Sequence, residues 1–440
     1  MKGERGPPDA LAGFRRFVSL ERDVLVLSLA MFAFSMGFQM TNRFLADYLV
    51  YLGATGFVVG AFATLGNAVG AVYPYYGGVV SDRVGSRRAL TLFGFVSTLG
   101  FAVWVVAAYV PAFDLAGVAV EPWIWVFVGL LLAQCWKSFG VGGHYAVVKQ
   151  SAAPGSLARG FAATETFRRT AFLVAPVVVA VFVAGGLMPG FLWVLGLAVV
   201  FGAVGTVVQH LLYDSSEDTV GREFEGLHRV LDDVRSLPVE HRPLLAADGV
   251  VRFANGMVYA FFVLVVTREM ELGLSLSLPV AGAVDLSPAS FFGVLLGVEM
   301  VVALVTMAPV SVVADRFGFK RVVTLGFLVY AVFPAMLIHA PESQSVLVAL
   351  FAFSGLRFAG LPAHKALVVG PAEKGEGGRV TGTYYLVRGS LVIPSGVVGG
   401  VLWEYVSPEA AFTLASTVGL VGVAYYAVYG RDIELHRPVT

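Results

Sequence analysis

The chain has 440 residues, of which 57% are hydrophobic and 14% are charged, with 30 basic and 30 acidic side chains. A soluble domain carries about 25% charged residues, so this composition excludes an ordinary soluble protein and indicates a membrane protein. The zero net charge gives no sign of a nucleic-acid partner. The single cysteine, Cys135, excludes a disulfide framework within one chain, and we expect neither a metal nor a cofactor.

The N-terminal segment, residues 1–23, is polar and basic. No small-residue cleavage site follows the apolar stretch after it, so we expect a retained first membrane helix and not a cleaved signal peptide.

Apolar stretches of about 20 residues, long enough to cross a bilayer, recur along the chain. We predict twelve spans, at about 24–50, 55–80, 88–110, 122–147, 160–185, 189–213, 244–268, 289–313, 320–340, 344–367, 378–402 and 408–429. The predicted parts are an N-terminal segment (1–23), a six-helix half (24–213), a central linker (214–243), a second six-helix half (244–430) and a tail (431–440).

Basic residues in the connections predict the orientation. With the N-terminus in the cytoplasm, the inner segments hold 22 Lys and Arg residues, and the outer loops hold one, Arg268. Lys and Arg concentrate on the cytoplasmic side of membrane proteins. We therefore expect a multi-pass protein of the cell membrane with both termini, the linker and the tail in the cytoplasm.

One charged motif occurs twice, half a chain apart. Residues 77–90 read GGVVSDRVGSRRAL and residues 310–323 read VSVVADRFGFKRVV. Asp82 matches Asp315 at an offset of 233 residues, and Lys137 matches Arg357 at an offset of 220. These matches indicate two parallel repeats, related by an axis along the membrane normal.

The motif resembles the signature G-x-L-A-D-R-x-G-R-K-x-x-L of the major facilitator superfamily of secondary transporters. The residues that fit the signature are Gly78, Asp82, Arg83, Gly85, Arg87 and Leu90, and the second copy keeps Asp315, Arg316, Gly318 and Lys320. The second copy departs at Ser311, where the signature has its first glycine. The resemblance implies an all-α membrane protein with twelve helices in two pseudo-symmetric six-helix halves.

The resemblance also implies that both motif copies form a cytoplasmic gate, with Asp82 latching an outward-facing state. Gly85 follows the end of span two, where a turn with positive φ favours glycine. The alternative is that these basic loops only set the topology.

Seven basic residues fall inside the predicted spans, where each costs about 2.5–3.5 kcal/mol at the centre of a helix. They are Arg43, Lys137, Arg168, Arg169, Arg252, Arg357 and Arg388. We expect four acidic residues to be buried with them, namely Asp47, Glu165, Asp248 and Glu299. If every acid pairs with a base, about three positive charges remain for an anionic substrate.

Residue spacing gives candidate roles. Arg43 and Asp47, like Asp248 and Arg252, are four apart and can pair on one helix face. Glu299 has no basic residue within a turn, so we expect it to exchange protons, or else to pair with a surplus arginine. The expected substrate contacts are Gln39, Asn42, Arg43, Lys137, Arg168, Arg357, Tyr384 and Arg388, and the candidates for proton coupling are Glu299, Glu165 and Asp47.

The leading hypothesis is a monomeric secondary transporter in the lipid bilayer. It would move a small solute, which we expect to be an organic anion, by alternating access with proton coupling or exchange. The alternatives are a proton-coupled exporter of lipophilic compounds with the same fold and, more distantly, a receptor or sensor that does not transport. No Walker A motif indicates ATP-driven transport, and no close ligand spacing supports a membrane enzyme.

Overall fold

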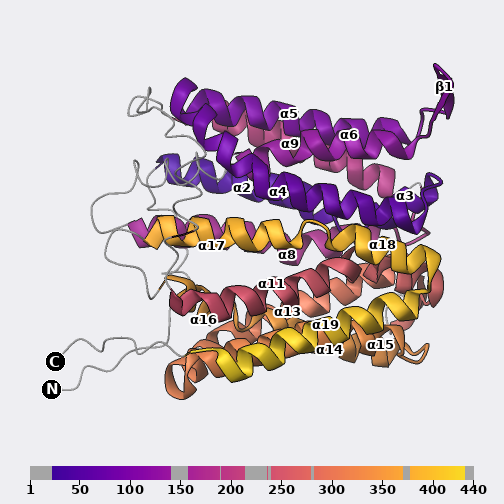
Figure 1. Cartoon of the computed structure of the whole chain (residues 1–440). Coiled ribbons are helices and arrows are strands. Elements are labelled where there is room, and N and C mark those ends of the chain that lie inside the picture. Colours follow the sequence, from indigo (N-terminus) through magenta and orange to yellow (C-terminus); the bar gives the residue numbers. More distant parts are fainter. Residues whose placement is uncertain are drawn as a thin grey trace.

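The computed structural model describes residues 22–139, 157–188, 190–213, 235, 239–278, 282–369 and 377–431. Nearly all of the described chain is helical, and the helices run side by side as one bundle (Figure 1). Most helices up to α9 lie in the upper part of the view and most of those from α11 onward in the lower part, while α8 and α17 overlap in the middle.

The helices before the linker keep the predicted order. They are α2 (Arg22–Thr41), α3 (Leu45–Tyr51), α4 (Gly56–Val84), α5 (Ser86–Ala107), α6 (Trp123–Gln134) with the π-helix η1 (Cys135–Phe139), α8 (Leu157–Phe182) and α9 (Gly190–Leu212).

The helices after the linker are more often interrupted. They are η2 (Val239–His241), α11 (Arg242–Val258), η3 (Tyr259–Phe261), α12 (Phe262–Leu264), the π-helix η4 (Val265–Glu269), α13 (Pro288–Phe317), α14 (Phe319–Ile338), α15 (Gln344–Gly355), η5 (Leu356–Phe358), α16 (Leu361–Val369), α17 (Gly377–Val392), α18 (Ser395–Tyr405) and α19 (Pro408–Tyr429).

In the described residues, nine helices are long and apolar enough to cross a membrane. A tenth span results if α2 and α3, which meet at a bend of 47°, are taken together. An all-α membrane protein is thus confirmed, whereas the count of twelve and the boundaries of the two halves stay predictions. Several predicted spans are not continuous helices; for example, Pro394 precedes α18 because proline lacks the N–H group that a continuous helix needs.

Two β-hairpins, which we did not predict, project from one end of the bundle. Strands β1 (Phe113–Leu115) and β2 (Val118–Val120) pair antiparallel, as do β3 (Leu274–Leu278) and β4 (Gly282–Leu286). The residues at the β1–β2 turn, Ala116 and Gly117, both have positive φ. We call this end, where β1 and α3 lie in Figure 1, the hairpin side.

The hydrophobic core continues across the two helix groups near the hairpin side. Phe44 follows α2 and is fully buried. Its ring lies 6.1 Å from that of Phe191 of α9 and 5.5 Å from that of Phe292 of α13. Aromatic packing of this kind excludes water from the seam between the groups.

Two close helix pairs join the groups at the same side. A Cβ atom on Gly60 of α4 would collide with the carbonyl oxygen of Gly396 of α18, so these backbones touch. Small residues permit such contact between membrane helices. Between α8 and α13, the Ser290 hydroxyl donates to the Ala180 carbonyl, and the Ser287 amide donates to Ala184 at 3.1 Å. The bundle is therefore sealed at the hairpin side.

Candidate functional site

A cavity of about 580 Å³ lies between the two helix groups. Ligand sites commonly measure about 300–1,000 Å³, so a small solute fits. Its lining residues are Ala63, Gly66, Asn67, Gly70 and Ala71 of α4; Gln134 of α6 and Lys137 of η1; Arg252, Asn255 and Gly256 of α11; Tyr259 and Ala260 of η3; Tyr330 of α14; Arg357 and Phe358 of η5; and Tyr385, Arg388, Gly389 and Val392 of α17.

The cavity wall is basic. Lys137, Arg252, Arg357 and Arg388 all contribute to it, and no carboxylate is among its described lining residues. Lys137 and Arg357 occupy matched positions of the sequence repeat, one on each side of the cavity. Several cations around one water-accessible space form a binding site for an anion.

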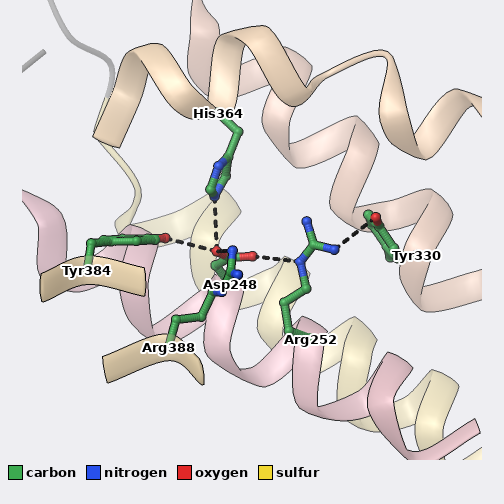
Figure 2. A network of polar contacts seen from close by, with 6 residues as sticks. All are labelled: Asp248, Arg252, Tyr330, His364, Tyr384 and Arg388. Atoms are coloured by element: carbon green, nitrogen blue, oxygen red, sulfur yellow. Dashed lines mark hydrogen bonds and ion pairs between the residues drawn. The ribbon is translucent and has the colours of Figure 1, made fainter. Parts of the chain in front are cut away.

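Asp248 of α11 anchors one ion-pair network behind this wall (Figure 2). Its fully buried carboxylate accepts hydrogen bonds from Arg252 Nε at 3.2 Å, Tyr384 Oη at 3.1 Å and Arg388 Nη1 at 3.4 Å, and it contacts His364 Nε2 at 3.1 Å. The predicted pairing of Asp248 with Arg252 is confirmed. The network ties α11 to α16 and α17, and it holds two guanidinium groups at the edge of the cavity.

Arg252 continues this network across the cavity wall. Its Nη1 donates to Tyr330 Oη at 2.9 Å, and its guanidinium carbon lies 4.5 Å from the centre of that ring. The Arg252 side chain remains 23% exposed, so a solute in the cavity can reach it.

Glu299 of α13 anchors a second network. It accepts hydrogen bonds from Arg43 Nη2 at 3.0 Å, Ser354 Oγ at 2.6 Å and Arg357 Nη2 at 2.5 Å. Glu299 is therefore not alone, and the alternative in which it pairs with a surplus arginine is confirmed. Its partners lie far away in sequence, which is why local spacing could not identify them.

Several buried polar atoms near the cavity make no hydrogen bond within the described part of the chain. They are Nη1 of Arg43, Nε and Nη1 of Arg357, Oδ1 of Asn255 and Oε1 of Gln134. Buried polar groups normally find partners, and those that do not are candidates for binding a ligand or water. Donor and acceptor atoms thus surround the same space.

Asp47 of α3 pairs across the groups with Arg268 of η4, with 2.6 Å between Oδ1 and Nε. The predicted pairing of Asp47 with Arg43 is wrong. Arg43 lies in the turn between α2 and α3, so the two residues do not share a regular helix face. The sequence placed Arg268 in an outer loop and gave no sign of this contact.

We predict that Arg268→Gln weakens closure of the hairpin side. The Arg268 side chain is 40% exposed, and partly exposed ion pairs contribute about 1 kcal/mol or less, so transport should fall only a few-fold. Uptake into proteoliposomes measures the effect. The exchanged pair, Asp47→Arg with Arg268→Asp, should recover part of the rate, and no recovery would contradict a direct interaction.

Comparisons with known proteins agree with this architecture. A sequence profile of the Major Facilitator Superfamily matches residues 250–439. An uncharacterized MFS-type transporter of Methanocaldococcus jannaschii is 21% identical over 403 residues, which cover 91% of this chain and 93% of that protein. The second half of the chain is thus similar to the major facilitator superfamily.

Solved structures of transporters have the same fold as this chain. The nucleoside transporter NupG superposes with a TM-score of 0.70 at 12% identity, covering 92% of this chain and 98% of that chain. A POT family transporter in complex with 5-aminolevulinic acid gives 0.70 at 12% identity, covering 94% and 99%. The chain therefore has the fold of these transporters.

The structure describes only some side chains of the two motif copies. Gly85 and Gly318 have φ of 88° and 98°, which accords with a glycine at each turn. Arg87 donates from Nε to the His210 carbonyl at 2.9 Å and so joins α5 to α9. Arg316 lies over the ring of Phe317. Gly78 and Lys320 lie on α4 and α14, whereas the side chains of Asp82, Arg83 and Asp315 are outside the described part, so the latch remains a prediction.

Some expected substrate contacts lie away from the cavity. Tyr384 is fully buried and bonds to Asp248, so its neighbour Tyr385 lines the cavity in its place. Gln39 and Asn42 are half-buried and do not line it. Arg168 lies 5.6 Å from the ring centre of Phe172 and is also absent from the lining. The Glu165 side chain is outside the described part.

The glycines of α4 and α13 differ in their surroundings. Gly293 meets Ala180 of α8 at 3.1 Å from its Cβ position, which fits packing. Gly66 and Gly70 face the cavity, and a Cβ atom on Gly70 would meet no atom within 4 Å. Gly66 and Gly70 are thus not required for a close helix contact.

Proposed function

We propose that this transporter carries a small organic anion through the basic cavity by alternating access. The cavity supports this proposal because cations line it and no described lining residue is acidic. A cavity for lipophilic cations would instead be expected to present a carboxylate.

The charges around the cavity favour an anion. Four cations line the cavity, and Arg43 lies behind its wall. Only two carboxylates, those of Asp248 and Glu299, pair with any of these five cations in the described region. Because three positive charges exceed the acidic ones in this described region, an anion with one or more negative charges would balance them.

We further propose that the cavity opens alternately to the cytoplasm and to the hairpin side. The seals between α4 and α18 and between α8 and α13 lie at the hairpin side, which supports an inward-facing state if both termini are cytoplasmic. We also propose that the protein works as a monomer in the cell membrane, organised as two six-helix halves.

Transport would be driven by proton coupling or by exchange of anions. Glu299, Glu165 and Asp47 are the proposed proton carriers. Protonation of Glu299 would release both Arg43 and Arg357, which would make these guanidinium groups available to the substrate. Uptake measured with and without a pH gradient distinguishes proton coupling from exchange.

The experiment that tests the proposal is a binding and uptake screen of the purified protein. The panel holds mono-, di- and tricarboxylates, phosphate esters, neutral sugars, amino acids and lipophilic cations. A ligand that binds only the folded state raises the melting temperature. We expect anions to stabilise the protein and to enter proteoliposomes. Stabilisation by lipophilic cations alone would overturn the proposal and favour the exporter.

We predict that Lys137→Gln weakens anion binding about tenfold or more, because it removes a cation from the cavity wall. Isothermal titration with the anion found in the screen measures the loss. The matched control is Arg242→Gln, which removes one positive charge from an exposed residue at the start of α11. Equal affinities for the two variants would contradict a role for Lys137.

A further inference from the structure

The two walls of the cavity differ in shape as well as in charge. The wall from η3, α14, η5 and α17 contributes four aromatic side chains, namely Tyr259, Tyr330, Phe358 and Tyr385. The wall from α4 contributes small residues, namely Ala63, Gly66, Gly70 and Ala71, with Asn67 as the one larger side chain.

Two arginine guanidinium groups stack on tyrosine rings of the aromatic wall. Arg43 lies 4.2 Å from the ring centre of Tyr259, and Arg388 lies 4.6 Å from that of Tyr385. Stacking of this kind fixes the plane of each tyrosine ring. Tyr259 nevertheless keeps 41% of its surface exposed, so it presents apolar ring surface to a solute in the cavity.

The opposite wall leaves room for a flat group. A Cβ atom on Gly70 would meet nothing within 4 Å, and one on Gly66 would meet only Leu130 Cδ2, at 4.0 Å. These glycines are therefore not needed for a tight helix contact, unlike Gly60 on the same helix. Their absent side chains instead leave open space in the cavity lining of α4.

We propose that the substrate is a planar organic anion, in which an aromatic or fully unsaturated ring carries the acidic group. The ring would lie between the glycine face of α4 and the tyrosines, and the acidic group would bind Lys137, Arg357 or Arg388. Aromatic surfaces stack with a favourable energy that a puckered ring of the same size does not obtain. This proposal rests on the proposed function as an anion transporter and specifies its substrate class.

The test compares two probes that differ in little except planarity. Benzoate and cyclohexanecarboxylate carry the same charge on a six-carbon ring, and gluconate serves as an anion without a ring. We expect benzoate to bind about tenfold more tightly than cyclohexanecarboxylate by isothermal titration, which corresponds to about 1.4 kcal/mol. Tyr259→Leu should bring the affinities of the two probes together.

A steric variant tests the opposite wall. A Cβ atom on Gly70 would meet no atom within 4 Å, and Gly70 lines the cavity, so Gly70→Leu should extend into the cavity and abolish the preference for benzoate. The matched control is Gly196→Leu on α9, where a Cβ atom also meets nothing within 4 Å and which does not line the cavity. Similar melting temperatures for the two variants show that the fold is retained.

The outcomes separate the two proposals. Equal binding of all three anions, undisturbed by Gly70→Leu, would overturn the planar substrate and leave the anion transporter standing. Preferential binding of gluconate would also overturn it. If no anion binds and a neutral solute or a cation does, both proposals are overturned.

Discussion

Gly60→Leu is expected to reduce transport strongly while leaving solute binding measurable. A Cβ atom on Gly60 would collide with the Gly396 carbonyl oxygen and lie 2.7 Å from the Gly400 Cα atom. These are backbone atoms, so α4 and α18 must separate. Overpacking costs about 1–3 kcal/mol, enough to shift a two-state equilibrium about 5- to 150-fold. The carrier would then stay open at the hairpin side.

Two measurements check this result. Uptake into proteoliposomes should fall by about tenfold or more. Labelling of a cysteine placed at Ala63, with Cys135 replaced by Ala, should increase when an impermeant thiol reagent is added at the hairpin side. Gly196→Ala on α9 is the control, because a methyl group there meets no other atom within 4 Å and Gly196 does not line the cavity. Unchanged uptake and labelling would show that the contact between α4 and α18 does not close this side.

Asp248→Ala is expected to destabilise the protein strongly. It leaves the guanidinium groups of Arg252 and Arg388 without their carboxylate, and the buried Tyr384 hydroxyl without its acceptor. Removing one partner of a buried ion pair costs about 3–5 kcal/mol. The melting temperature in detergent should fall clearly, and an anionic ligand should restore more of it than it adds to the wild type.

The control for Asp248→Ala is Asp285→Ala, which removes the same charge from an exposed position on β4. This variant should melt like the wild type, since exposed substitutions usually change stability by about 0.5 kcal/mol or less. Equal melting temperatures for the two variants would contradict a structural role for the Asp248 network.

The sequence predicted the helices and the basic interior well, because both follow from hydropathy and from the cost of burying charge. Local pairs were predictable only where a helix is regular. The four-residue spacing correctly predicted the ion pair of Asp248 with Arg252 within α11. The same spacing wrongly predicted a pair of Arg43 with Asp47, because the chain bends by 47° there. The partners of Glu299 come from distant segments and left no local pattern.

Which face of a helix meets the cavity was the hardest feature to predict. Adjacent residues differ by about 100° around a helix, so Tyr384 and Tyr385 point to different places, and an apolar helix surface gives no sign of which one meets water. The hairpins did leave a signal that we did not use. Residues 274–278 read LSLSL, an alternation typical of a strand.

The excess of cations around the cavity has an energetic consequence for the transport cycle. A carrier that closes around an empty cavity must withdraw these charges from water without an anion to balance them, and burying an unpaired ion costs several kcal/mol. We therefore expect the empty carrier to reorient slowly and the loaded carrier to reorient quickly. Adding substrate on one side of the membrane should then accelerate the exit of labelled substrate from the other.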